Sequence, residues 1–124
     1  MASANAKILA WTAVVAAAHT AGIFFLYNAT GWFDNLVHFL GGVWLFNAAP
    51  VLIKRKMSPA ETVLAVLVAA LLWENFEGAL NWYAVESYGY VTPVGGGTLD
   101  TFLDIVLGTL GALTAASCFR RRQT

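Results

Sequence analysis

Four apolar segments constrain the fold of this chain more than any other feature. They span residues 7–27, 32–53, 59–83 and 99–119, and each approaches or exceeds the roughly 20 residues that a helix needs to cross hydrocarbon. Hydrophobic residues make up 59% of the 124 residues and charged residues only 11%, a composition outside the usual range of soluble domains. We therefore expect one all-α domain over residues 1–124, a bundle of four transmembrane helices.

The basic residues predict the orientation. All seven fall at the start of the first segment, between the second and third, or after the fourth, and the other two connections contain none. By the positive-inside rule, both termini are expected in the cytoplasm, with the protein in the cell inner membrane as a multi-pass protein. Four spans is the count that places every basic residue on one side. These residues are Lys7, Lys54, Arg55, Lys56, Arg120, Arg121 and Arg122.

The helix boundaries carry recognisable signals. Ser58-Pro59-Ala60-Glu61 is a capping sequence with proline at the first helical position. A loop is expected from Ala84 to Thr98, because Pro93 and the glycines at 95–97 exclude a helix there. Residues 7–27 are interpreted as a retained helix, since their apolar run exceeds a signal-peptide core and lacks a small-residue cleavage site.

Glu74 and Glu77 lie inside the third apolar segment. Their i, i+3 spacing places both carboxylates on one face of a helix. One acid at the bilayer centre costs about 3 kcal/mol on insertion scales, so a membrane acid at depth is a functional residue by default. Two such acids need a shared proton, a cation or polar partners.

Other ionisable groups fall at a similar depth. At 1.5 Å per residue, Glu77, Glu74 and His38 lie roughly 9–14 Å from the outer helix ends. Small residues below His38 and Asp104 (Gly41, Gly42, Gly108 and Gly111) indicate that these polar faces point into the bundle. The candidate metal- or proton-binding residues are His38, Glu74, Glu77 and Asp104, with Asp34, Asp100 and His19 in second rank.

Carboxylates with one or two imidazoles suit a divalent metal ion such as Mg²⁺, Mn²⁺, Fe²⁺ or Zn²⁺. The match to di-iron bundles is partial, because their Glu-x-x-His motif is replaced here by Glu-x-x-Glu. A proton shared among clustered acids would serve equally well.

Structural roles also account for part of this set. Asp34 and Asp100 could be first-turn acids favoured by the helix dipole, and His19 a polar packing residue. A hydrogen-bonded cluster with a purely structural role is a further alternative for the whole set. The aromatic residues Tyr27, Trp82 and Tyr83 are interpreted as part of an interfacial belt.

Three motifs resemble those of a known family. Asp34 to Gly42 (DNLVHFLGG), Trp73 to Glu77 (WENFE) and Asp100 to Asp104, followed by Leu110-Gly111-Ala112, resemble segments of the YjdF-like bacterial inner-membrane proteins. The VanZ-like membrane proteins share a looser form of this layout. The resemblance implies a helical membrane fold and a site without a known activity. The link of VanZ-like proteins with glycopeptide-antibiotic tolerance hints at a role in the cell envelope.

Three functions remain open at this point. One is a metal-dependent enzyme acting on a lipid or envelope substrate, with a carboxylate as general base. A second is a proton- or cation-coupled transporter, for which four helices would require a homo-oligomer. A third is a non-catalytic protein that binds ions or lipid headgroups. No nucleophile motif, cofactor fingerprint or nucleic-acid motif narrows this choice, and the expected partner is the lipid bilayer.

Overall fold

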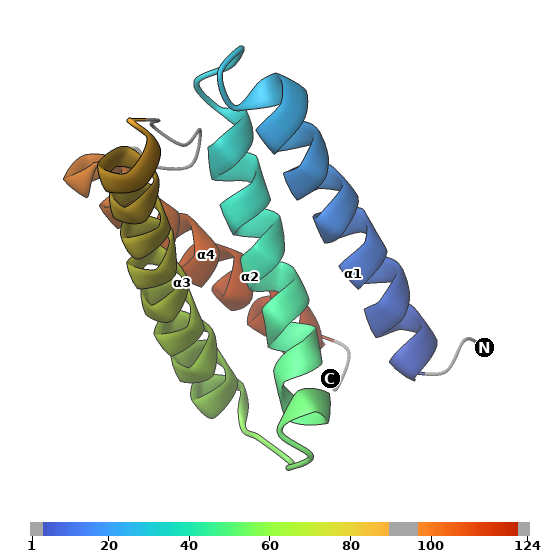
Figure 1. The fold of residues 1–124 in the computed structure, drawn as a ribbon. Coiled ribbons are helices and arrows are strands. Elements are labelled where there is room, and N and C mark those ends of the chain that lie inside the picture. Colours follow the sequence, from blue (N-terminus) through green and yellow to red (C-terminus); the bar gives the residue numbers. More distant parts are fainter. Residues whose placement is uncertain (1–3, 90–96, 122–124) are drawn as a thin grey trace.

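The computed structural model describes residues 4–89 and 97–121, and these are helical with no strand. Four α-helices follow one another, with a π-helical turn, η1 (Gly22–Leu26), continuing the first (Figure 1). The bounds are α1 (Ala4–Ala21), α2 (Phe33–Leu52), α3 (Pro59–Tyr88) and α4 (Thr98–Arg121). All four are long and apolar enough to cross a membrane, which confirms the predicted all-helical fold with four candidate spans.

The predicted start of α3 is confirmed in detail. Ser58 accepts a hydrogen bond from the Glu61 backbone N–H, and the Glu61 side chain accepts one from the Ser58 N–H, with Pro59 at the first helical position. The Glu61 carboxylate also pairs with Arg55 from the preceding turn. This reciprocal capping box fixes where the chain re-enters a helix.

The predicted end of α3 is wrong. A loop was expected from Ala84, but the helix continues to Tyr88 and ends at Gly89, which takes a left-handed φ of 61°. No residue between Ala84 and Tyr88 breaks a helix, and glycine supplies the left-handed conformation of a helix C-terminus at little steric cost. The remaining signals for this loop, Pro93 and the glycines at 95 and 96, lie outside the described residues.

The first helix changes its winding near its end. It is α-helical to Ala21 and π-helical from Gly22 to Leu26, which the sequence did not predict. The Tyr27 ring folds back over Gly22 so closely that a Cβ at this position would collide with it. Single π-turns inside α-helices often occur at functional sites.

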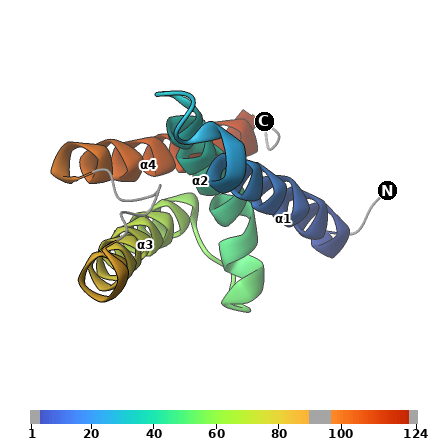
Figure 2. The same ribbon diagram turned by 45° about the horizontal axis from the view of Figure 1, so that its top comes forward.

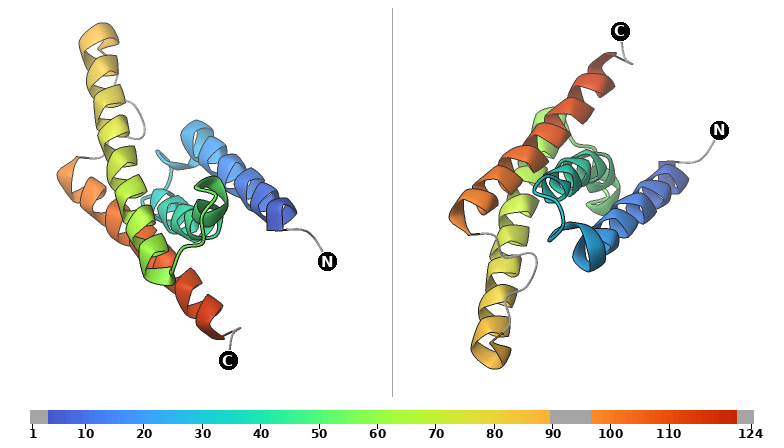
Figure 3. Two further views of the ribbon diagram at one scale, coloured as in Figure 1. Left: turned by 90° about the horizontal axis from the view of Figure 1, so that it is seen from below. Right: turned by 90° about the horizontal axis from the view of Figure 1, so that it is seen from above.

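Helix α2 lies at the centre of the arrangement. It packs against α1, α3 and α4, whereas the backbone of α1 approaches no described helix other than α2 and its own continuation η1 (Figure 2). Helix α4 crosses α2 obliquely (Figure 3), and the two pack most extensively of all the pairs. A small core of Phe46, Val66, Ala112 and Ala116 joins α2, α3 and α4.

The two ends of the bundle differ in charge. Helices α2 and α3 meet at the end that contains Lys54, Arg55 and Lys56, and α1 begins and α4 ends toward the same side (Figure 1). We call this the basic end. The opposite end, where α1 is connected to α2, is called the distal end.

Candidate metal centre

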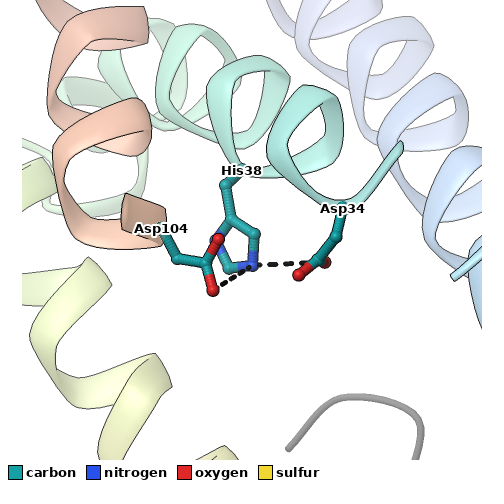
Figure 4. A group of neighbouring side chains, drawn as sticks. All are labelled: Asp34, His38 and Asp104. Carbon is teal, nitrogen blue, oxygen red and sulfur yellow. Dashed lines mark ion pairs between the residues drawn. The ribbon is translucent and has the colours of Figure 1, made fainter. Parts of the chain in front are cut away.

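His38 lies on the second turn of α2 with carboxylates from two helices beside one ring nitrogen. Its Nε2 is 3.5 Å from Asp34 Oδ1, one turn earlier on α2, and 3.6 Å from Asp104 Oδ2 on α4. Figure 4 shows the two carboxylates on either side of this nitrogen. The i, i+4 spacing of Asp34 and His38 directs both side chains to one face of α2. Asp104 joins them because α4 crosses α2 at this face.

The second ring nitrogen of His38 faces α3. Nδ1 is 3.9 Å from Glu74 Oε1. His38, Glu74 and Glu77 each offer one ligand atom within 4.8 Å of the others, and the same holds for Asp34, His38 and Asp104. The imidazole thus lies between Asp34 and Asp104, which are beside Nε2, and Glu74, which is beside Nδ1.

The side chains of Glu74, Glu77 and Asp104 are turned away from the exposed surface of the protein. Asp104 is 2% exposed and Glu77 6% exposed, whereas Phe76 next to Glu77 is 56% exposed. The Glu74 side chain is also only 7% exposed, so both glutamates of α3 point away from the exposed surface of the protein. Within the described residues, Asp104 Oδ1 is buried without a hydrogen-bond partner.

Two glycine contacts bring α2 and α4 close enough for this arrangement. A Cβ on Gly42 would collide with the Gly108 carbonyl, and a Cβ on Gly111 would collide with the Phe39 carbonyl. Small residues at such crossings let the two backbones touch. His38 and Asp104, each one turn from these contacts, therefore meet across the interface.

Gly41 does not share this role. The sequence pattern grouped Gly41 with Gly42 as a packing residue, yet a Cβ on Gly41 would meet nothing within 4 Å. Adjacent helical residues point about 100° apart, so only one of the two can face α4.

Trp73 is a site residue that the sequence analysis did not include among the candidates. Its indole N–H donates a 2.6 Å hydrogen bond to Glu77 Oε1, one turn further along α3. The i, i+4 spacing of Trp73 and Glu77 was the signal that could have identified this pair. The bond fixes one oxygen of a buried carboxylate.

His19 and Asp100 are near the centre but outside both groups. His19 Nδ1 lies 2.7 Å from the Tyr27 hydroxyl, and its ring makes an edge contact with Trp73 at 5.9 Å between centroids. The Tyr27 side chain, from the residue that follows η1, thus reaches back toward α1. Asp100 is half-buried in the first turn of α4, the position of a first-turn acid.

The comparisons with known proteins concern the whole chain. No curated protein and no solved structure matches it. The model of the family described as "Predicted membrane protein (DUF2238)" matches residues 3–124, which is nearly the full length. This match and the four apolar helices agree on a protein of the lipid bilayer, and the chain belongs to the DUF2238 family of membrane proteins.

Proposed function

We propose that this protein binds one divalent metal ion within the membrane through Asp34, His38 and Asp104, and uses it to engage a polar group of a lipid or envelope substrate. The observation that carries this proposal is Asp104 Oδ1, a carboxylate oxygen buried without a hydrogen-bond partner among the described residues. A buried charged oxygen without a partner is costly, and a cation is the partner that relieves this cost.

The spacing of the donor atoms supports a metal on the Nε2 side. Two ligands each about 2.1 Å from a metal lie roughly 3.0–3.5 Å apart in tetrahedral or octahedral geometry. The distances from His38 Nε2 to Asp34 Oδ1 and Asp104 Oδ2 are 3.5 and 3.6 Å. A small inward adjustment of each side chain would complete a three-ligand site. Bidentate binding by the Asp104 carboxylate would bring Oδ1, the oxygen without a hydrogen-bond partner, to the same ion.

The glutamates fit a supporting role better than a ligand role. A neutral imidazole has one lone pair, so His38 can bind a metal through only one nitrogen. If Nε2 binds the ion, the Nδ1 proton faces Glu74, the arrangement in which a carboxylate orients a ligating histidine. Glu77 already accepts the Trp73 N–H.

The types of ligand in the site limit which metal ions would bind there and what chemistry they would support. Two carboxylates and one imidazole suit Mn²⁺, Fe²⁺ or Zn²⁺, with Mg²⁺ as a harder alternative. Three protein ligands leave positions open, and a metal in such a site polarises an oxygen of a bound substrate. The site lies in the distal half of the bundle, which the positive-inside rule would place toward the periplasm or cell exterior.

Metal binding by the purified full-length protein in detergent tests the proposal. Elemental analysis would identify the ion retained, and Mn²⁺ titration followed by electron paramagnetic resonance would give its affinity. We expect Asp104→Asn to weaken Mn²⁺ binding by at least about tenfold, since even supporting residues of metal sites contribute 10–100-fold. Asp100→Asn is the matched control, because it removes an acid from the same helix outside both groups.

Equal binding by wild type and Asp104→Asn would refute the proposal. Equal losses in Asp104→Asn and Asp100→Asn would also refute it, because they would indicate only a general attraction of cations to acidic residues.

The narrower features stay predictions. These are the YjdF-like and VanZ-like resemblance, the inner membrane as location, cytoplasmic termini and homo-oligomer formation.

The alternative of a proton- or cation-coupled transporter would require a polar path from the site to the basic end. The cavity that leads from His38 toward that end is instead lined by residues such as Val15, Leu45 and Val66.

A further inference from the structure

A cavity of about 400 Å³ begins at the candidate metal centre and runs toward the basic end. Four helices line it. The lining covers steps of seven residues on α1 (Thr12 to His19) and α3 (Val66 to Trp73) and of eight on α2 (Val37 to Leu45), and α4 adds Asp104 and Gly108. At 1.5 Å per residue, these steps give a cavity roughly 10 Å long and parallel to the helices. Its volume is within the range of small-molecule binding sites.

The two ends of the cavity differ in chemistry. His19, His38 and Asp104 line the distal end, beside the metal centre. The other end is bounded by Leu45 and Val66, and by the hydrogen bond of 2.8 Å from Trp44 Nε1 to Thr12 Oγ1. The walls between are alanine, valine and glycine. A ligand that fits therefore has a polar head and an apolar extension.

The cavity lies in the space between α1 and α3. The described parts of these helices do not pack backbone against backbone, although both line it, and Figure 3 shows them apart on either side of α2. At the distal end this space is bridged by the edge contact of His19 with Trp73. In a bilayer, the side between α1 and α3 faces lipid, so a hydrocarbon chain could enter without leaving the membrane.

Gly41 is part of the cavity wall and keeps it open. An added Cβ at Gly41 would have nothing within 4 Å, whereas at Gly42 it would collide with Gly108. Any larger residue at position 41 would project into space that is now empty.

We propose that the cavity holds one hydrocarbon chain of a lipid that has a phosphate head group, with the phosphate oxygens at the metal bound by Asp34, His38 and Asp104. This inference rests on the proposed function, because four carboxylates would repel an anionic head group unless a cation lay between them. Hard and borderline divalent ions accept phosphate oxygens in their open positions. Lipid tails are as apolar as the cavity wall, so moving the tail from the bilayer into the cavity gains little free energy. The cavity therefore selects the tail by its shape, and the metal supplies the binding affinity.

Photo-cross-linking with matched lipids tests this inference. The full-length protein in nanodiscs is exposed to a single-chain phosphomonoester lipid with a diazirine in the middle of its tail, and labelled residues are mapped by mass spectrometry. A lipid with the same chain and a phosphocholine head group serves as the control probe. We expect the phosphomonoester to label Leu45, Val66 and Ala69 more than the phosphocholine lipid does, and we expect EDTA to remove the difference.

Cavity-filling variants locate the bound chain. Gly41→Phe should lower labelling of the cavity residues about tenfold, which requires only about 1.4 kcal/mol of steric exclusion. Ala69→Phe, on the opposite wall, should do the same and covers the case in which Gly41→Phe fails to fold. Gly78→Phe is the matched control, because Gly78 is a helical glycine with equal free space but lines a separate groove between α3 and α4.

Mn²⁺ titration of each variant without added lipid separates the two proposals. If the wild-type protein does not bind Mn²⁺, the proposed function itself is refuted. A second outcome is that the protein binds Mn²⁺ but Gly41→Phe and Ala69→Phe leave the labelling unchanged. This would indicate lipid on the outer surface only and would overturn this inference alone. Equal labelling by the two probes, or labelling that EDTA does not change, would overturn the head-group assignment.

Discussion

The carbonyl of Gly108 occupies the space into which a side chain on Gly42 would project. This contact sets the separation of α2 and α4, and the distance of 3.6 Å between His38 Nε2 and Asp104 Oδ2 depends on it. Gly42 follows His38 by one turn on α2, and Gly108 follows Asp104 by one turn on α4. The packing glycines and the polar pair are therefore parts of one interface.

Alanine substitutions at the neighbouring glycines Gly42 and Gly41 should affect stability differently. Gly42→Ala forces the two backbones apart, and we expect a loss of about 1–3 kcal/mol in the free energy of unfolding, as for overpacked cores. Gly41→Ala meets open space and should be neutral or stabilising by up to about 1 kcal/mol, because alanine favours the helix. Thermal unfolding in detergent, followed by helical circular dichroism, measures both. Equal melting temperatures for the two variants would contradict the close crossing.

Replacing Trp73 should perturb the site through Glu77. In Trp73→Phe the buried Glu77 Oε1 loses its N–H donor. An unsatisfied buried acceptor costs about 1–3 kcal/mol, so the melting temperature should fall. Trp82→Phe is the control, because Trp82 is 66% exposed and its replacement should change stability by less than about 0.5 kcal/mol. Similar melting temperatures for both variants would argue against the Trp73–Glu77 bond.

A metal that binds only the folded protein should raise its stability. At a free Mn²⁺ concentration of 100 times the dissociation constant, the gain is about 2.7 kcal/mol. His38→Gln should remove this gain because it deletes the nitrogen that faces both aspartates. Glu61→Gln, at the far start of α3, should retain it. Thermal unfolding with and without Mn²⁺ gives the comparison, and stabilisation that survives in His38→Gln would place the ion elsewhere.

The Tyr27 hydroxyl should remain protonated well into the alkaline range. Burial is the main cause that raises the pKa of this phenol, and the nearby Asp34 carboxylate adds to it. A raised pKa means that the neutral, hydrogen-bonding form beside His19 persists to higher pH than in free tyrosine. Ultraviolet titration of tyrosinate should show a late component that Tyr27→Phe removes. A titration curve unchanged by Tyr27→Phe would contradict the burial of this group.

Cysteine labelling tests the orientation. In a Cys118→Ser background, Tyr88→Cys should react with a membrane-impermeant maleimide while the inner membrane is intact. The cells used either have no outer membrane or have one that has been permeabilised. Lys56→Cys should react only after the inner membrane is disrupted. Labelling in the reverse order would place the candidate metal centre near the cytoplasmic face and would overturn the positive-inside assignment.

The sequence determined the axial layout of this protein. Apolar length set the four spans, the Ser58–Glu61 signals set where α3 begins, and a fixed rise per residue placed His38, Glu74, Glu77 and Asp104 at similar depth. These quantities depend on local composition and on the helix repeat alone. Where the local signal was absent, as at Ala84 and at the π-turn from Gly22, the expected boundaries differ from the structure.

Only the tertiary structure decided how the helices are rotated and crossed. It turned Gly42 to α4 and Gly41 to the cavity. It placed both aspartates near one nitrogen of His38 and Glu74 near the other, and it brought Tyr27 back to His19. Depth along a helix follows from its own residues. Rotation about the axis depends instead on contacts between helices far apart in the sequence, such as Gly42 with Gly108, where a single methyl group would change the fit.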